Sequence, residues 1–176
     1  LNSIVTNVTK QGVYIGSEFI ETENIIWAAG NAASPIVSQV TSHVNKSKQA
    51  LVNPDFSIKE DKSIFCVGDC CYLKDANNSV VPAVAQGAIQ AGEFVSNQII
   101  ADQNNKPRGA FSYFDKGSMA TIGRSRAIAD IKGLKFSGFF AWLLWGIIHI
   151  FFLVDFRNRL LVVLDWITSY FTHKRA

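Results

Sequence analysis

Apolar and polar residues alternate over short distances in the first part of the chain, which is typical of strands and turns. The alternation predicts strands over residues 3–8 and 13–15, separated by glycine turns. A short apolar run, "IIWA" at residues 25–28, ends near Gly30. Its length and the flanking glycine predict a buried strand of a parallel sheet. Residues 34–44 are compatible with a weak helix or with an irregular connection.

The stretch "IFCVGDCCYLKDANNSVVPAVAQGAIQAG", residues 64–92, carries the clearest pattern. Before it, residues 53–55 predict the turn of a small hairpin. The apolar residues at the start of the quoted stretch predict a buried strand over 64–68, which ends on a glycine followed by an aspartate. A polar loop follows, and then an alanine-rich helix over 81–102 with a proline in its first turn. The pattern therefore places a carboxylate at the end of an apolar strand, shortly before a helix of small residues.

A polar stretch with proline and glycine, residues 102–109, predicts a boundary. Beyond it, a strand-like region has turns at 116–117 and 132–133, and two long apolar segments follow at 136–154 and 160–171. The last third of the chain is therefore expected to be a separate region of strands and helices.

The two apolar segments raise the question of a membrane. Residues 136–154 are 19 positions without a formal charge. As a helix they would measure about 28 Å, close to the hydrocarbon thickness of about 30 Å. However, tryptophans lie in the middle of the segment, whereas spanning helices keep them near their ends. Residues 160–171 are amphipathic at helical spacing. These features favour helices that lie in the membrane interface; the alternative is an apolar dimer interface.

Charge is divided unevenly along the chain. Residues 1–108 carry eight Lys and Arg against ten Asp and Glu, a net charge of −2. Residues 109–176 carry nine against four, a net charge of +5, in the most aromatic part of the chain. Basic residues beside long apolar runs favour a membrane surface, because a nucleic-acid surface would need them on a solvated face. No nucleic-acid partner is expected.

The three cysteines, Cys66, Cys70 and Cys71, form one cluster. Their odd number predicts no disulfide framework, and they indicate a reducing compartment. The three histidines are scattered and show no zinc spacing. Small buried thiols are therefore a simpler interpretation than a redox or metal site.

Asp69, directly behind Gly68, is the main candidate for ligand binding. In an open α/β sheet, ligands bind at the carboxyl ends of strands, and a glycine lets them approach the backbone. A carboxylate there can accept hydrogen bonds from ligand hydroxyls. The N–H groups of residues 83–85 are expected to favour an electron-rich ligand edge. Gln86 and Gln90 share one helix face. The simpler alternative is a turn-capping aspartate and two solvated glutamines.

Three stretches carry a family resemblance: "AVAQGAIQ" (83–90), "MATIGRSRAIAD" (119–130) and "FAWLLWGIIHIFFLVDFRNRLLVVLDW" (140–166). With the Gly-Asp strand end, they resemble the C-terminal part of type II NADH dehydrogenase, the single-chain NADH:quinone oxidoreductase. The resemblance covers essentially the whole chain. It implies an α/β fold: the C-terminal part of a flavoprotein with two dinucleotide-binding (Rossmann-like) domains, followed by a membrane-anchoring helical region.

The resemblance also divides the chain. Residues 1–33 would be the end of the NADH-binding domain, 34–108 the C-terminal part of the FAD-binding domain, and 109–176 a C-terminal membrane-anchoring region with amphipathic helices. Neither of the GxGxxG loops that such an enzyme needs for FAD and NADH occurs in the chain. Both are expected upstream of Leu1, so the chain by itself is expected to be an inactive fragment.

The resemblance implies roles for individual residues. The cofactor would be FAD, with the ribityl chain on Asp69. The FAD-binding residues would be Gly68, Asp69, Val84, Ala85, Gln86, Ala29 and Gly30. The quinone-site residues would be Gln86, Gln90, Ile122 and Gly123. No residue is expected to act as a nucleophile or to bind a metal. Many family members carry a further polar residue where this chain has Ala91, a departure at the rim of the quinone pocket.

The function implied by the resemblance is transfer of electrons from NADH through FAD to a membrane quinone, without proton pumping. The expected location is the inner membrane of the cell, as a peripheral, monotopic protein on the cytoplasmic side, docked through residues 136–175. A homodimer is left open. One alternative is a sulfide:quinone oxidoreductase, which would need redox cysteines beside the flavin. The other is a non-catalytic flavoprotein remnant that docks to membranes.

Overall fold

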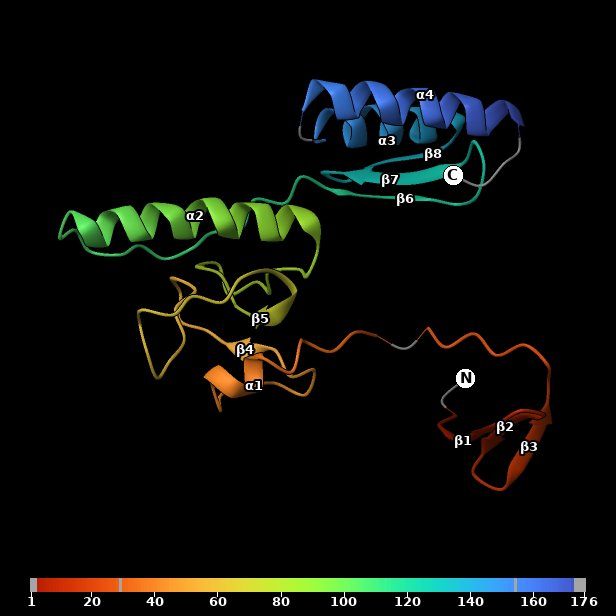
Figure 1. The fold of residues 1–176 in the computed structure, drawn as a ribbon, viewed down its shortest axis with the longest axis horizontal. Coiled ribbons are helices and arrows are strands. Elements are labelled where there is room, and N and C mark those ends of the chain that lie inside the picture. The colour runs from red at the N-terminus through yellow and green to blue at the C-terminus, as the bar shows by residue number, and fades with distance from the viewer. Residues whose placement is uncertain (1–2, 29, 154, 173–176) are drawn as a thin grey trace.

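The computed structural model describes residues 3–28, 30–153 and 155–172, and Figure 1 shows three bodies along the chain. The first is an antiparallel meander in the order β1-β2-β3. Its strands are β1 (Val5–Thr9), β2 (Gly12–Ile15) and β3 (Glu18–Glu21). The first two confirm the strands predicted near 3–8 and 13–15. The third was missed, because its glutamates hide the alternation.

An extended connection, not a strand, follows the meander. The prediction of a buried strand at 25–28 is wrong: Ile26 is 92 % exposed and Trp27 67 % exposed. A strand needs a neighbour for its backbone N–H and C=O groups, and the described part of the chain pairs none with this run. Gly30 follows with a left-handed φ of +64°. Ala29, assigned above to the flavin, lies outside the described residues.

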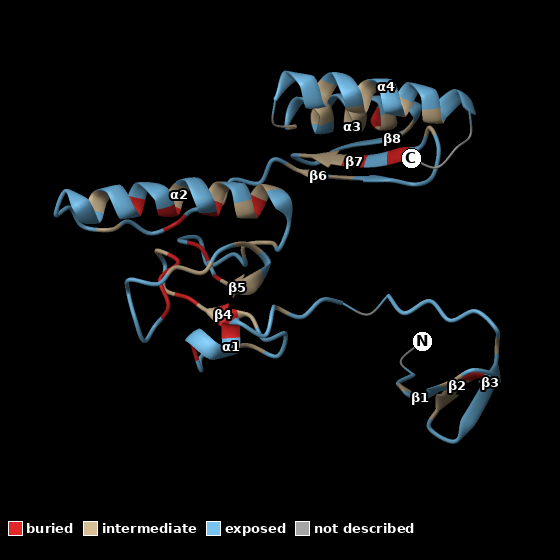
Figure 2. Ribbon diagram, viewed as in Figure 1, coloured by how far each residue is buried: buried red, intermediate tan, exposed pale blue. Residues whose placement is uncertain are grey.

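The middle body packs one long helix over irregular chain. Its elements are α1 (Val37–Val40), β4 (Ala50–Leu51), a 3₁₀ turn η1 (Gly68–Cys70), β5 (Cys71–Tyr72) and α2 (Ala85–Gln103). Strands β4 and β5 are parallel. The core lies under α2, where the rings of Phe56, Phe94 and Phe111 meet edge to face. Figure 2 shows the buried positions of this body between α2 and the loops below it.

Two predictions for this body are corrected. Residues 64–68 are not a buried strand: Phe65 forms a single bridge with Ser57, and Ile64 and Val67 are exposed. The adjacent sheet is only two residues long in each strand, so it offers 64–68 no continuous neighbour. The helix begins at Ala85, not at residue 81, because Val84 is extended. Its predicted end near 102 is confirmed.

The third body has three layers (Figure 1). An antiparallel sheet, β6-β7-β8, lies under α3, and α4 lies on the far side of α3. The elements are β6 (Ser118–Thr121), β7 (Ala127–Ile131), β8 (Leu134–Gly138), α3 (Phe139–Phe151) and α4 (Phe156–Thr172). The turn predicted at 132–133 joins β7 to β8, as expected.

Small residues let α3 lie close to its sheet. Ala127 and Ala129 of β7 and Ala141 of α3 are buried against one another. Over the described part of the chain, neither α3 nor any other helix combines the length and apolarity needed to cross a membrane. The functional division of the chain at residues 33 and 108 stays a prediction.

Candidate functional site

The Gly-Asp turn lies where the middle body meets α2. Gly68 opens the 3₁₀ turn with a left-handed φ of +69°, which L side chains rarely adopt. A Cβ on Gly68 would lie 3.5 Å from the Cβ of Ala88, so the turn packs directly on α2. The Asp69 side chain is exposed, and its backbone carbonyl accepts a hydrogen bond from Gln49 Nε2 at 3.1 Å. The turn therefore presents a carboxylate to solvent beside the start of α2.

The start of α2 is built by a second close contact, at Gly87. A Cβ there would lie 2.5 Å from the carbonyl oxygen of Pro82, closer than such contacts occur. The Val84 N–H donates to the same carbonyl at 2.9 Å. The assignment of ligand-binding N–H groups to 83–85 is therefore wrong at Val84, whose donor is already used. The first-turn donors of α2 are those of Ala85, Gln86 and Gly87. The sequence argument missed Gly87, although a glycine inside a helical pattern is a signal for a close approach.

The two glutamines of α2 bind the segment that leads into the third body. Gln86 Nε2 donates to the Gly117 carbonyl at 2.9 Å, and its Oε1 accepts from the Lys116 N–H at 3.3 Å. Gln90 does the same with the backbone of Phe114, at 2.9 and 3.0 Å. Each side-chain amide thus pairs with backbone as a neighbouring strand would. The glutamines join α2 to residues 114–117, and both residues are half-buried.

Ile122 and Gly123 lie in the turn between β6 and β7. Ile122 is exposed, and Gly123 has a left-handed φ of +74°. Gln86 binds Gly117 just before β6, whereas Gly123 follows β6, so the two points are separated by roughly 20 Å of extended chain. The structure therefore brings Gln86 and Gln90 together and places Ile122 and Gly123 at the other end of the strand.

Comparison with known proteins identifies the family. Residues 116–175 match the family described as the NDH2 C-terminal domain. The whole chain is 36% identical to the type II NADH:quinone oxidoreductase NdhA of Mycobacterium tuberculosis and 34% identical to Ndh of the same organism. The chain corresponds to a C-terminal portion of type II NADH dehydrogenase. This confirms the resemblance drawn from the sequence motifs.

A solved structure has the same fold. The chain aligns over 96% of its length, with a TM-score of 0.78 and 16% identity, to half of NDH2 from Plasmodium falciparum in complex with NADH. A further relative, the demethylphylloquinone reductase NdbB of Synechocystis, is 27% identical over 93% of the chain. The chain spans about two fifths of the length of the curated relatives it matches, 39% of NdhA and 40% of Ndh.

Two of the three cysteines, Cys66 and Cys71, are poorly suited to thiol redox chemistry. Burial, with a contribution from Cys70, raises the pKa of the Cys66 thiol to about 11. Burial, with contributions from Cys66 and Cys70, raises the pKa of the Cys71 thiol to about 12. Both stay protonated at neutral pH, and the thiolate is the reactive form. Cys71 Sγ instead donates to the Gly68 carbonyl at 3.3 Å, a structural contact that supports the turn.

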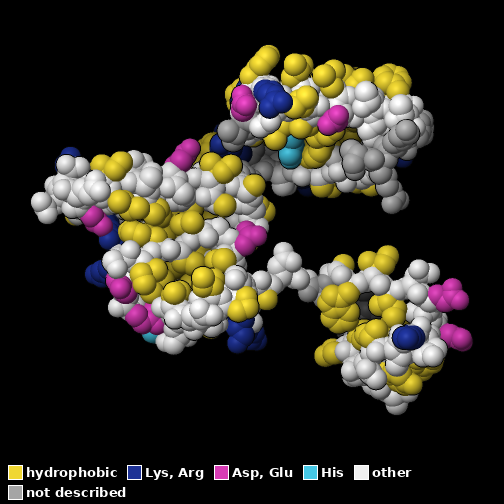
Figure 3. All heavy atoms as spheres, in the orientation of Figure 1, with side chains coloured by type: hydrophobic (Ala, Val, Ile, Leu, Met, Phe, Trp, Pro, Cys, Tyr) yellow, Lys and Arg dark blue, Asp and Glu magenta, His cyan; other side chains and the backbone are white. Residues whose placement is uncertain are grey.

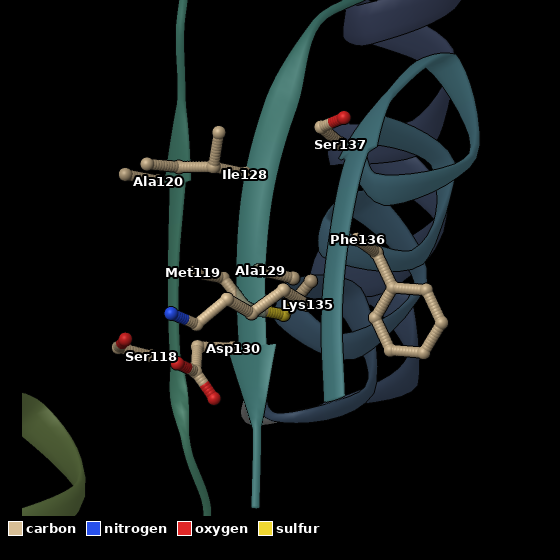
Figure 4. A pocket seen from close by; sticks show the side chains of 9 residues that line it. All are labelled: Ser118, Met119, Ala120, Ile128, Ala129, Asp130, Lys135, Phe136 and Ser137. Atoms are coloured by element: carbon tan, nitrogen blue, oxygen red, sulfur yellow. The ribbon is translucent and has the colours of Figure 1, made fainter. Parts of the chain in front are cut away.

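Two hollows lie in the third body. One, of about 450 Å³, covers the sheet face opposite α3, where Lys135 and Asp130 face each other across β7 and β8 with Ser118 beside them (Figure 4). The other is an apolar groove of about 570 Å³ between α3, α4 and the β6–β7 turn. Gly123 lines it, together with Trp142, Trp145 and Trp166, among others. Within the described part of the chain, no group of three His, Cys, Asp or Glu side chains could hold a metal ion.

The helices of the third body turn apolar side chains outward. Phe140 and Ile147 of α3 are 81 % and 58 % exposed, and Phe171 of α4 is 74 % exposed. Figure 3 shows apolar side chains spread over these helices. Cations lie at the junction of the two helices, with Lys116 over the Phe152 ring and Arg159 over the Phe151 ring, at 5.2 and 5.6 Å. Large exposed apolar patches are typical of surfaces that contact lipid or protein.

Proposed function

We propose that the protein carrying this chain is an FAD-dependent oxidoreductase that passes electrons from NADH to a membrane quinone. The observation that supports this most strongly is the similarity over the whole chain to two enzymes named type II NADH:quinone oxidoreductases, at 36% and 34% identity. The motifs of the sequence and the fold of NDH2 point the same way.

FAD would lie at the turn of Gly68 and Asp69. The surroundings suit it: Gly68 has no side chain to block the approach, and the Asp69 carboxylate is exposed beside the first turn of α2. We propose that Asp69 accepts hydrogen bonds from the ribityl hydroxyls. Ala85, Gln86 and Gly87 would direct their N–H groups to the electron-rich edge of the flavin, while Val84 would contribute only packing. Ala29 and Gly30 would lie near the flavin, where the chain returns to the FAD-binding domain. When bound, FAD supplies the redox chemistry, and the protein positions it.

Quinone would bind on the side of α2 that carries Gln86 and Gln90. An amide oxygen has two lone pairs and an amide nitrogen two hydrogens, so each glutamine keeps one acceptor and one donor site after binding backbone. Because the backbone of 114–117 fixes both amides, they would meet the quinone in a preset orientation. Ile122 and Gly123, at the far end of β6, would line the approach to the site.

Helices α3 and α4 would lie in the membrane interface. The exposed apolar side chains would enter the lipid, and the cations at the α3–α4 junction would meet anionic headgroups. This would place the protein peripherally on the inner membrane, on the cytoplasmic side where NADH is available. The same apolar face could instead be shared between two copies in a homodimer.

The test is a donor comparison on the complete gene product, purified in detergent. A flavin absorbance spectrum first establishes bound FAD, and quinone reduction is then measured with NADH and separately with sulfide. Rapid turnover with NADH is the expected result. Turnover with sulfide alone would overturn the choice of donor and make the cysteines central again. Bound FAD without either activity would leave a membrane-docking flavoprotein.

A further inference from the structure

The β6–β7 turn is fastened to the end of α4 through one side chain. Arg124 donates hydrogen bonds from Nη2 to the backbone carbonyls of Ser169, at 3.3 Å, and Tyr170. Its guanidinium lies 5.4 Å from the centroid of the Tyr170 ring. Beside it, Ser125 Oγ donates to the Tyr170 hydroxyl at 3.1 Å. These contacts join residues about 45 positions apart in the sequence.

The contact suits arginine in two ways. A cation is favoured near the C-terminal end of a helix dipole. The planar guanidinium can serve neighbouring carbonyls at once and lie over an aromatic ring, which a lysine ammonium cannot do in one position. The turn itself has a defined conformation, with left-handed Gly123 and Ser125 and a bond from the Ile122 N–H to the Arg126 carbonyl at 2.8 Å.

Aromatic contacts also hold α4 against α3. Its middle rests on α3 through the stacked rings of Trp145 and Trp166, 5.4 Å apart, and near its end Trp142 lies 5.8 Å from Tyr170. No residue of α4 is buried among those whose burial is described. Arg124 therefore lies between the outermost helix and the turn, and it also lines the groove with Gly123.

We propose that Arg124 is a positioning residue that couples the docking of α4 on lipid to the conformation of the β6–β7 turn. The outward face of α4 meets the lipid surface, the last turn of α4 holds Arg124, and Arg124 holds the turn that carries Ile122 and Gly123. When lipid restricts the motion of α4, it therefore also restricts the motion of the β6–β7 turn, which lines the approach of quinone to its site. This inference rests on the proposed function for its kinetic consequence, but its structural consequence can be measured independently.

The structural test is hydrogen exchange of the complete protein, with and without vesicles of phosphatidylethanolamine and phosphatidylglycerol. In the unsubstituted protein, vesicles are expected to slow exchange both in the last turn of α4 and in residues 122–126. In Arg124→Ala the slowing at 122–126 is expected to disappear while that in the middle of α4 remains. Arg126→Ala is the matched control, since it removes the same charge from the same exposed turn. Equal protection of 122–126 in Arg124→Ala, or none in the unsubstituted protein, would overturn the coupling.

The kinetic test separates positioning from general damage. Arg124→Ala is expected to raise the KM for quinone in vesicles about tenfold, the loss typical of charge-assisted hydrogen bonds. The kcat and the rate with ferricyanide, a soluble acceptor, are expected to stay within about twofold. Equal losses with both acceptors would mean structural damage and would contradict the proposal. Absence of NADH oxidation in the unsubstituted protein would refute the proposed function, and the exchange result would still decide the coupling.

Two milder variants guard against misfolding of Arg124→Ala. Arg124→Lys keeps the charge but is expected to restore only part of the protection at 122–126, because one ammonium cannot serve two carbonyls and the ring together. Ser125→Ala removes only the hydroxyl contact to Tyr170, and a smaller loss of protection is expected. Full protection in both variants would contradict the role given to this contact.

Discussion

Single glycines let backbone segments approach more closely than any side chain would allow. At Gly87 the neighbour is the Pro82 carbonyl, 2.5 Å from where a Cβ would lie. At Gly117, which has a left-handed φ of +98°, the neighbour is the Asp130 carbonyl, at 2.3 Å. The first contact shapes the start of α2, and the second sets the start of β6. Both positions are therefore determined by tertiary packing and not by helix or strand preference.

Gly87→Ala is expected to destabilise the protein by about 1–3 kcal/mol, the usual cost of forcing an extra carbon into a packed site. The matched control is Gly92→Ala in the same helix, where nothing lies within 4 Å of the new Cβ. That change is expected to stabilise by up to about 1 kcal/mol, because alanine favours helix. Urea unfolding of both variants measures the difference. Equal effects at the two positions would contradict the role of the Pro82 contact.

Asp69→Ala is expected to weaken FAD binding by about 10–150-fold, the equivalent of one charge-assisted hydrogen bond of about 1.5–3 kcal/mol. The fold should persist, because the side chain is exposed. Flavin content per protein, measured by absorbance after dialysis, checks this, with circular dichroism as the test of folding. Glu93→Ala removes an exposed carboxylate outside this turn, on α2, and should leave flavin content unchanged. Full flavin occupancy in Asp69→Ala would remove Asp69 from the site.

Helix α2 does more than cover the core of the middle body. Its two glutamines bind the extended segment 114–117, so this helix is the element that joins the middle body to the third. At its far end Gln98 Oε1 accepts from the Gly109 N–H at 2.7 Å. A helix that binds the following chain at both ends holds the returning segment antiparallel to itself, and Figure 1 shows the chain running back along α2.

Gln90→Glu tests this joining role. A carboxylate at position 90 would face the Phe114 carbonyl, to which Gln90 now donates, and would have no proton to give. We expect a loss of about 1–3 kcal/mol in stability, the cost of an unsatisfied polar pair. Hydrogen exchange at 114–117 should accelerate. Asn97→Asp adds the same charge at an exposed position of the same helix and should change neither the stability nor the exchange at 114–117. An equal effect of Asn97→Asp would mean that the added charge, and not the lost hydrogen bond, causes the change.

For the whole molecule, the outward apolar face of α3 and α4 predicts binding to lipid vesicles. Replacing both Phe140 and Leu164 by Gln is expected to lower the vesicle-bound fraction strongly, since burial of each side chain contributes about 1.5–3 kcal/mol. Flotation with anionic vesicles measures it. Phe19→Gln, on the exposed β3 strand of the first body, is the control and should bind normally. Unchanged flotation of the double variant, with loss of a dimer instead, would favour an interface between two copies.

Acid is expected to destabilise the middle body, because Arg108 joins distant parts of it. Arg108 binds Asp55 and Asp102 and donates to the Lys62 carbonyl at 2.8 Å. Burial opposes ionisation of Asp55, but hydrogen bonds from Ser57 and Arg108 prevail and lower its pKa. The hydrogen bond from Arg108 likewise lowers the pKa of Asp102.

The folded-state pKa values are below the unfolded value of about 3.9, so the stabilisation is present above about pH 4 and is lost as the pH falls through the folded values. Urea midpoints should be level from about pH 7 to 5 and fall below about pH 4. Arg108→Leu should lower the midpoint at neutral pH and flatten the acid decrease. Lys106→Leu, at an exposed position, should change neither the midpoint at neutral pH nor the decrease in acid. If the urea midpoint of Arg108→Leu fell in acid as steeply as that of the unsubstituted protein, the ion pairs of Arg108 would not be the cause of the acid sensitivity.

The local pattern was sufficient where neighbours in sequence are neighbours in space. It predicted the first two strands of the meander, the end of α2 and the turn at 132–133, because alternation, glycine turns and helical spacing act over a few residues. The family followed from its motifs in the same way, since "MATIGRSRAIAD" and the Gly-Asp turn are local strings. The net charge of +5 after residue 108 likewise needed no coordinates.

Contacts between distant segments decided the remainder. The runs at 25–28 and 64–68 have the composition of buried strands, but a strand forms only where a neighbour offers its backbone, and neither run has a continuous one among the described residues. Gln86 and Gln90 look like exposed helix positions until residues 114–117 return to them. Nothing in the local sequence distinguishes Arg124 from the other cations; its role depends on α4, whose last turn accepts its hydrogen bond. Such partners lie 24 to 46 positions away along the chain, beyond the reach of any local pattern.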